Sequence, residues 1–200
     1  MLLCDAKKKL NFPQDRLVLG GVGRLSPEKN FAGLIRVVAK LLNEGFPLAL
    51  YIAGDGDCRE VLQTQIDATG HAEWIHLIGF CENVQDFYQG LDLFVLNSLR
   101  EGLPNVVLEA MAYEVPVLST RVAGVPQMIT NGYNGVLVEM NSDEDLERRL
   151  RMLIAEPEYR HMLSENGFLT VEKQYNFSFR MKKIRSIYDQ VLGISGAKTS

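Results

Sequence analysis

The hydrophobic positions of the chain follow two different spacings. Short apolar runs, which are typical of buried strands, occur at residues 17–22, 48–53, 75–78, 93–96, 115–119 and 136–138. Between the first two runs, apolar residues recur every three or four positions from Phe31 to Leu42, the spacing of a buried helix face. Asn30 precedes this segment as a helix cap, and Gly45 followed by Pro47 ends it.

Further helical patterns separate the later apolar runs. They occur between Leu62 and Gly70 and at residues 104–112, 142–155 and 158–174. This alternation predicts an α/β fold: a Rossmann-like parallel sheet of about six strands with helices on both faces. Ligands of such sheets bind at the carboxyl ends of the strands, and the residues that fall there are Gly23, Gly54, Gly79 and Glu101.

Composition and charge narrow the class of protein. The chain has 200 residues, of which 46% are hydrophobic, and this fits one globular domain with a sizeable core. A formal net charge of −4 argues against a nucleic-acid partner. Three widely spaced cysteines form neither a disulfide framework nor a C-x-x-C motif, which favours a reducing compartment. No run is long enough to span a membrane and no signal peptide is recognisable, so we expect a cytoplasmic protein.

The strand-to-helix junction that follows residue 96 carries the clearest candidate chemistry. Pro104 suits the first position of the helix, so the N–H groups of Asn105 and Val106 would form an anion site there. Glu101 precedes this helix and Glu109 lies one turn inside it. A phosphate at the helix start would lie between the two carboxylates. This arrangement suits a nucleotide sugar, with sugar hydroxyls on one acid and the ribose diol on the other.

Two cations fall on the same predicted edge of the sheet. Arg24 and Lys29 lie in the loop between the first strand and the first helix. A diphosphate leaving group needs its growing charge neutralised, and preorganised cations do this most effectively. On this segment alone, two solvated loop charges are an equally good interpretation.

Three other interpretations of these motifs are weaker. Gly21-x-Gly23-x-x-Ser26 half matches a dinucleotide fingerprint, but Ser26 replaces the third glycine. Asp55 and Asp57 form an Asp-x-Asp pair that could hold a metal, although a glycine-rich turn is the better explanation of both. The two glutamates also differ from a glycosidase acid pair, whose carboxyls face each other across one bond.

Six segments, in order, resemble the C-terminal, nucleotide-sugar-binding half of a GT-B glycosyltransferase of family GT4, the glycosyl transferases group 1. They are VGRLSPEKN at 22–30, IAGDG at 52–56, IHLIGF at 75–80, SLREGLPNVVLEAMA at 98–112, PVLSTRVAGVPQMI at 116–129 and NGYNGVLV at 131–138. There are also departures. Glu114 stands where the family usually has glycine, and left-handed backbone there would cost about 1 kcal/mol. Gln127 replaces a common glutamate.

The resemblance implies a role for each matching residue. The residues that match Arg24 and Lys29 bind the donor's phosphates, and the acid that matches Glu101 contacts the hydroxyls of the transferred sugar. The acid that matches Glu109 takes the ribose hydroxyls, and backbone near Phe80 meets the base. The implied catalytic residues are Glu101, Arg24 and Lys29, and the implied donor site comprises Gly23, Arg24, Lys29, Gly54, Gly79, Phe80, Glu101, Gly102, Leu103, Asn105, Val106 and Glu109.

The resemblance also implies an activity for the whole enzyme. A GT4 enzyme transfers a sugar, here of hexose type, from a UDP-, GDP- or ADP-sugar to a glycan or lipid-linked acceptor, with retention and without a metal or other cofactor. Residues 1–15 then correspond to an interdomain linker, 16–192 to the donor-binding domain and 193–200 to a disordered tail. The N-terminal acceptor-binding domain is missing from this chain, so we expect the chain alone to be inactive.

Two alternatives to this function stay open. One is a non-catalytic nucleotide-binding or assembly module of the same fold, and the other is half of a GT-B nucleotide-sugar epimerase. Peripheral association of the whole enzyme with the cytoplasmic face of a membrane, as in polysaccharide biosynthesis, is also kept open.

Overall fold

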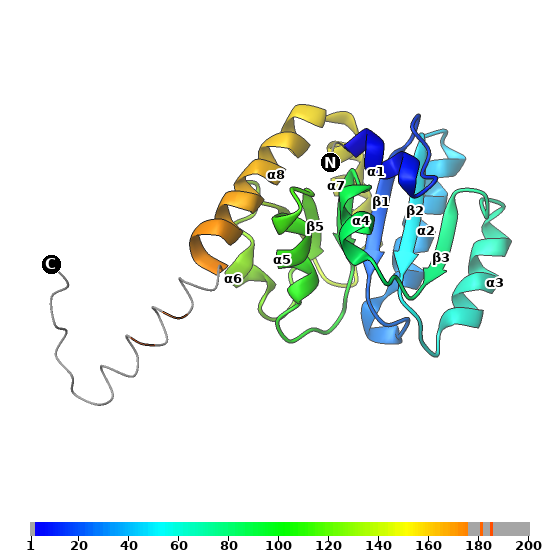
Figure 1. Ribbon diagram of the computed structural model, residues 1–200. Coiled ribbons are helices and arrows are strands. Elements are labelled where there is room, and N and C mark those ends of the chain that lie inside the picture. The colour runs from blue at the N-terminus through cyan, green and yellow to red at the C-terminus, as the bar shows by residue number, and fades with distance from the viewer. Residues whose placement is uncertain (1–2, 176–180, 182–184, 186–200) are drawn as a thin grey trace, which may run out of the picture.

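The computed structural model describes residues 3–175 together with residues 181 and 185 (Figure 1). Its centre is one six-stranded parallel sheet with the strand order β3-β2-β1-β4-β5-β6. The strands are β1 (Leu17–Val22), β2 (Leu48–Ala53), β3 (Ile75–Gly79), β4 (Leu93–Leu96), β5 (Val117–Thr120) and β6 (Val136–Val138). The predicted sheet is confirmed, and only β3 and β5 differ from the predicted ranges, by one or two residues.

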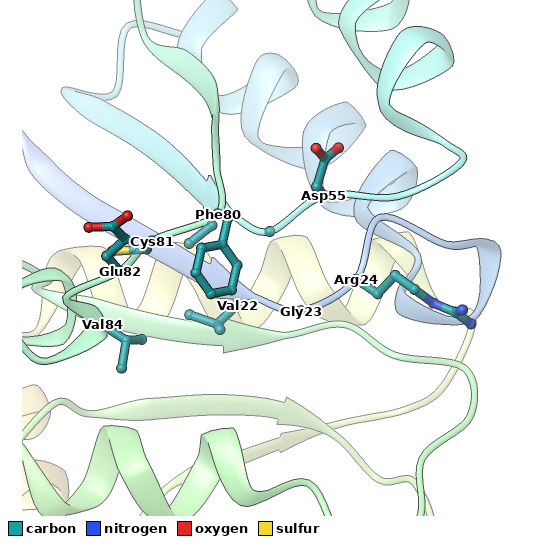
Figure 2. Close-up of a pocket in the computed structure, with 10 residues that line it drawn as sticks. Val22, Gly23, Arg24, Asp55, Phe80, Cys81, Glu82 and Val84 are labelled. Carbon is teal, nitrogen blue, oxygen red and sulfur yellow. The ribbon is translucent and has the colours of Figure 1, made fainter.

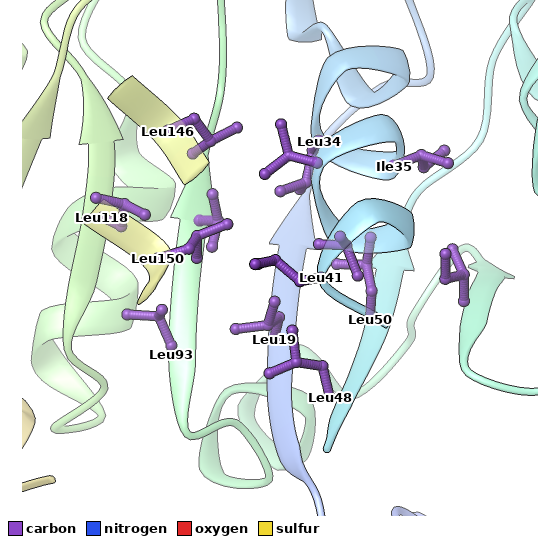
Figure 3. Close-up of a cluster of buried hydrophobic side chains, with 14 of the residues drawn as sticks. Leu19, Leu34, Ile35, Leu41, Leu48, Leu50, Leu93, Leu118, Leu146 and Leu150 are labelled. Atoms are coloured by element: carbon purple, nitrogen blue, oxygen red, sulfur yellow. The ribbon is translucent and has the colours of Figure 1, made fainter. Parts of the chain in front are cut away.

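Helices cover both faces of the sheet, as the alternating pattern predicted. One face carries α2 (Phe31–Asn43), α3 (Arg59–Thr69) and α7 (Asp143–Ala155). The other carries α4 (Val84–Gln89), α5 (Asn105–Ala112) and α6 (Val125–Met128). On the first face, leucines of α2 and α7 interdigitate with leucines of the strands, among them Leu34, Leu41, Leu150, Leu19 and Leu50 (Figure 3). Because both faces are buried, the strands are apolar runs without polar alternation.

The helix boundaries follow local capping chemistry. The Asn30 side chain accepts a hydrogen bond from the Gly33 N–H at the start of α2, and the Ser142 hydroxyl accepts one from the Asp145 N–H at the start of α7. Gly70 ends α3 with a left-handed φ of 74°. The predicted ends at Asn30 and Gly70 are confirmed, whereas Ser142, predicted as the first residue of its helix, is the N-cap of α7. Pro104, however, has extended backbone and lies one position before α5, at the N-cap and not at the first helical position.

Short helices at the start and middle of the chain escaped the sequence analysis. They are α1 (Leu3–Lys9), α4 and α6, each of seven residues or fewer, which is too short to show a helical period. The predicted last helix is observed as α8 (Pro157–Thr170), which continues as the π-helical segment η2 (Val171–Tyr175). Among the described residues, no helix combines the length and apolar character needed to cross a membrane.

The segment predicted to be an interdomain linker packs on the domain. Lys7 in α1 forms an ion pair with Asp92, the residue before β4, with Nζ and Oδ2 2.6 Å apart. Phe12 stacks on Tyr51 of β2, with ring centroids 4.0 Å apart. Whether residues 1–15 join two domains stays a prediction, and the predicted tail at 193–200 lies outside the described residues.

Candidate functional site

The carboxyl ends of β1, β2 and β3 surround a pocket of about 550 Å³ (Figure 2). Four predicted site residues line it: Gly23, Arg24, Gly54 and Phe80. The remaining lining residues, which were not among the predicted donor-site residues, are Val22, Ala53, Asp55, Cys81, Glu82 and Val84. The side chain of Phe80 is 83% exposed although it is aromatic, so the pocket presents a large apolar surface to solvent.

Glycines let the strand ends approach one another closely at this pocket. Gly54 has a φ of 141°, and a Cβ there would lie 1.9 Å from the carbonyl oxygen of Gly23. The Gly54 N–H donates to the carbonyl oxygen of Gly79 at 2.7 Å. A Cβ on Gly23 would in turn lie 3.0 Å from Cε of Lys29. A side chain at position 54 would therefore push the ends of β1 and β2 apart.

The structure joins two predicted site residues directly. Lys29 lies in the 3-10 turn η1 (Pro27–Lys29), and its Nζ is 2.6 Å from Oε1 of Glu101. The two side chains are only 19% and 11% exposed. The Ser98 hydroxyl donates to the same carboxylate oxygen, also at 2.6 Å. The cation and the carboxylate thus neutralise each other, a pairing that the sequence analysis did not predict.

Arg24 is the more exposed of the two predicted phosphate-binding cations. Its side chain points away from Phe80 in Figure 2, although the residue lines the pocket. A hydrogen bond from Ser26 and the Glu28 backbone lower the pKa of the Glu28 carboxyl, and the charges of Arg24 and Arg100 lower it further. Arg100, next to Glu101, is therefore a third cation at this edge that the sequence analysis missed.

Glu109, which lies in α5, has a different partner in α4. Its Oε2 accepts a hydrogen bond from the Tyr88 hydroxyl at 3.0 Å. Tyr88 is completely buried. Burial raises the pKa of the Tyr88 hydroxyl, and the negative charge of Glu109 raises it further, so this hydroxyl keeps its proton. The contacts of Tyr88 and Ser98 with the two glutamates were not predicted, because no sequence pattern links either hydroxyl to a particular carboxylate.

The predicted anion site lies at the start of α5, between these two glutamates in the chain. Asn105 and Val106 are the first two residues of α5, so their N–H groups have no acceptor within the helix. The loop before them is held by a hydrogen bond from the Gly124 N–H to the carbonyl oxygen of Gly102, at 3.3 Å. The Leu103 side chain packs against Gly124.

The Asp-x-Asp segment forms a turn. Asp55 accepts a hydrogen bond from the Gly56 N–H at 2.9 Å, and its Oδ1 lies 3.7 Å from Nη1 of Arg59. In the part of the chain that the structure describes, no three His, Cys, Asp or Glu side chains are grouped to hold a metal ion. Glu114 has the left-handed φ, 56°, that its position in the family pattern implied.

Comparison with known proteins gives the family. The model of the family described as "Glycosyl transferases group 1" matches residues 5–170. The lipopolysaccharide core biosynthesis glycosyltransferase LpsE of Rhizobium meliloti (strain 1021) is 31% identical over 170 residues, which cover 85% of this chain and 49% of that protein. The capsular polysaccharide biosynthesis glycosyltransferase CapM of Staphylococcus aureus is 28% identical over 192 residues, 92% of this chain and 49% of CapM. The chain spans about half the length of these curated relatives.

Solved structures give the same fold. The C-terminal domain of a glycosyl transferase group 1 family protein (LpcC) from Francisella tularensis superposes with a TM-score of 0.79 at 25% identity, over 86% of this chain and 92% of that one. Anabaena Alr3699/HepE in complex with UDP-glucose superposes with a TM-score of 0.84 at 20% identity, over 94% of this chain and 52% of that one. The chain therefore belongs to the glycosyl transferases group 1 family and has the Rossmann-like fold of its C-terminal domains.

Proposed function

We propose that this chain is the donor-binding domain of a retaining glycosyltransferase that moves a hexose-type sugar from a nucleoside diphosphate to a glycan or lipid-linked acceptor. One observation carries the proposal: Lys29 and Glu101, which would serve the diphosphate and the sugar, meet beside a glycine-lined pocket at the carboxyl edge of the sheet. Anabaena HepE, which shares the fold, has been solved with UDP and with UDP-glucose, and this supports a nucleotide sugar as the ligand class.

The donor would lie along the ends of the strands. The base would enter the pocket beside Phe80, and the ribose diol would bind Glu109. The diphosphate would lie at the start of α5, where free N–H groups and the helix dipole favour an anion. The transferred sugar would then reach Glu101.

The chemistry asked of these residues is electrostatic and positional. As the bond between sugar and phosphate breaks, negative charge grows on the diphosphate, and Lys29 and Arg24 would stabilise it. Glu101 would orient the sugar through its hydroxyls. No step in this scheme requires a metal, and we expect the acceptor and its binding residues to come from the rest of a longer enzyme.

Calorimetric titration of the 200-residue chain tests the donor-binding part. We expect binding of at least one of UDP, GDP and ADP, weaker binding of the matching nucleoside, and the same affinity in EDTA. If none of the three diphosphates binds, the proposal is wrong. If EDTA abolishes binding, the interpretation of Asp55 and Asp57 as metal ligands is favoured instead.

Two further measurements test the reaction. The chain alone should transfer no sugar to simple acceptors, and robust transfer would contradict its being half of an enzyme. A protein that contains this domain together with the acceptor domain should yield a product with the donor's anomeric configuration by NMR. An inverted product would exclude the retaining reaction.

A further inference from the structure

Each of the two candidate donor glutamates is held by one buried hydroxyl. The Ser98 hydroxyl donates to Oε1 of Glu101 at 2.6 Å, and the Tyr88 hydroxyl donates to Oε2 of Glu109 at 3.0 Å. Both Ser98 and Tyr88 are completely buried, whereas the glutamates are partly exposed. A buried hydroxyl restricts where a partly exposed carboxylate can lie, because the position of the hydroxyl is set by the core.

Ser98 is fixed by the sheet that surrounds it. It lies two residues beyond the end of β4, and its carbonyl oxygen accepts a hydrogen bond from the Thr120 hydroxyl of β5 at 2.7 Å. The preceding residue, Asn97, donates from its side chain to the carbonyl oxygen of Asn30 at 3.2 Å. The backbone at Ser98 is therefore held by contacts on both sides of β4. These contacts fix the position from which the Ser98 hydroxyl donates.

The lysine contact of Glu101 differs from the serine contact in one respect. Lys29 has a long, flexible side chain, and in the proposed function it leaves Glu101 for the diphosphate. The side chain of Ser98 is too short to leave Glu101 for the diphosphate in this way. Ser98 would then be the partner that keeps Glu101 in place while the donor is bound.

Tyr88 is fixed by aromatic packing. Its ring stacks on Tyr113, with centroids 5.7 Å apart, and lies against Phe94 at the same centroid distance. Glu109 and its hydroxyl partner lie on different elements, α5 and α4. The position of the Glu109 carboxylate is thus set by the packing of α4 against the sheet as well as by α5 itself.

We propose that Ser98 and Tyr88 are positioning residues for the donor, Ser98 for the transferred sugar and Tyr88 for the ribose. This inference rests on the proposed function. Each hydroxyl occupies one carboxylate oxygen and leaves the other, Oε2 of Glu101 and Oε1 of Glu109, to accept from ligand hydroxyls. The ligand groups selected at both places are therefore hydrogen-bond donors, as sugar and ribose hydroxyls are.

Variants that remove only the hydroxyls test the inference by calorimetry of the 200-residue chain with UDP and UDP-glucose. If the diphosphate panel favours guanine, GDP and GDP-mannose replace them. Ser98→Ala should weaken UDP-glucose about tenfold and change UDP less than about twofold, because UDP carries no transferred sugar. Tyr88→Phe should weaken both ligands by the same factor, about fivefold to tenfold.

A double-mutant cycle and a comparison with a modified ligand distinguish a positioning role from a general loss of structure. In a Glu101→Ala background, Ser98→Ala should change UDP-glucose affinity no further, because its partner is gone. With 2′,3′-dideoxyuridine diphosphate, Tyr88→Phe should have no effect, because the ribose hydroxyls are gone. Ser164→Ala and Tyr51→Phe are matched controls in the same fold and should leave both affinities unchanged. If Ser98→Ala does not fold, Ser98→Cys, a weaker donor of similar size, takes its place.

The outcomes distinguish the inference from the proposed function. If the wild-type chain binds none of the probes, the proposed function fails. If it binds them and the Ser98 variant loses UDP and UDP-glucose equally, or the Tyr88 effect persists with the dideoxy ligand, the inference alone is overturned. Unchanged affinities in both variants overturn it as well.

Discussion

Lys29 and Glu101 are 72 positions apart in the chain, and their side chains form an ion pair with Nζ and Oε1 2.6 Å apart. In the proposed function Lys29 binds the diphosphate and Glu101 binds the transferred sugar, so the free domain would hold these two side chains on each other. Donor binding would then replace the Glu101 contact of Lys29 by a contact with the diphosphate. Since the pair is mostly shielded from solvent, its attraction is stronger than that of a surface pair, and the exchange should reduce the net gain in affinity from the lysine.

Removal of the lysine charge should weaken diphosphate binding specifically. We expect Lys29→Ala to cost about 1–3 kcal/mol in UDP affinity, because a charge-assisted contact is lost, and the loss should shrink as salt is added. Calorimetry with UDP and uridine at two salt concentrations measures this. Lys40→Ala, which removes an exposed lysine paired with Glu147 on the helical face, is the control. Equal losses for UDP and uridine would show that the site is misplaced.

The two glutamates should respond differently to substitution. Glu101→Ala should leave UDP affinity unchanged or slightly higher, since it releases Lys29 and removes a like charge near the phosphates, but it should weaken UDP-glucose. Glu109→Ala should weaken UDP and UDP-glucose equally, because the ribose is common to both. Titration of each variant with both ligands checks this. Identical profiles for the two variants would mean that the predicted orientation of the donor is wrong.

Gly54 should be irreplaceable, whereas Gly70, another glycine with a positive φ, should not. A Cβ at Gly54 would lie 1.9 Å from a backbone oxygen, but one at Gly70, with φ of 74°, would meet nothing within 4 Å. Gly70→Ala should therefore cost only about 1 kcal/mol of unfolding free energy. Gly54→Ala should cost several times more and abolish UDP binding. Urea unfolding and calorimetry compare the two, and similar costs would contradict the predicted clash.

The buried Lys7–Asp92 pair should stabilise the attachment of the N-terminal segment. The two side chains are 8% and 16% exposed, and Asp92 also accepts from the Val18 N–H at 2.7 Å. Asp92→Ala leaves Lys7 without its counter-charge and should lower the unfolding free energy by about 3–5 kcal/mol. The control is Asp143→Ala, whose partner Arg36 is exposed, with an expected loss of no more than about 1 kcal/mol. Urea unfolding that gives equal losses would rule out a special role for the buried pair.

The loss of folding stability at acid pH should depend on Asp145. Burial opposes its charged form, but hydrogen bonds from the Glu139 N–H and Arg148, with the charges of Arg148 and Arg149, outweigh burial and lower the pKa of the carboxyl. The unfolded chain then binds the proton more readily than the folded one. The stabilisation is present above the unfolded pKa, near pH 4, and is lost as the pH falls through the lower folded pKa.

Asp145→Asn should therefore destabilise the domain at neutral pH and flatten the fall in stability below about pH 4. The measurement is thermal unfolding from pH 7 to pH 3, with Asp57→Asn, at an exposed position, as the control. A constant difference between wild type and Asp145→Asn across this range would contradict the assignment.

Much of the fold was readable from local sequence. The six apolar runs became the six strands, and Asn30 and Gly70 marked helix ends, because caps and hydrophobic periods act over a few neighbouring residues. The motifs also placed Arg24, Lys29 and Glu101 on one edge, since the carboxyl ends of parallel strands lie together. The short helix α4 escaped because six residues show less than two turns of any pattern.

The partners of the site residues were decided only by tertiary structure. Glu101 is held by Ser98 and Lys29, and Glu109 is held by Tyr88, because strand order and helix packing bring these side chains within hydrogen-bond distance. The same packing places the segment predicted as a linker against the domain, where Lys7 forms an ion pair with Asp92. Local sequence determines which segments become strands and helices, but a contact between two elements depends on how each packs on the whole sheet, and neither element carries that information alone.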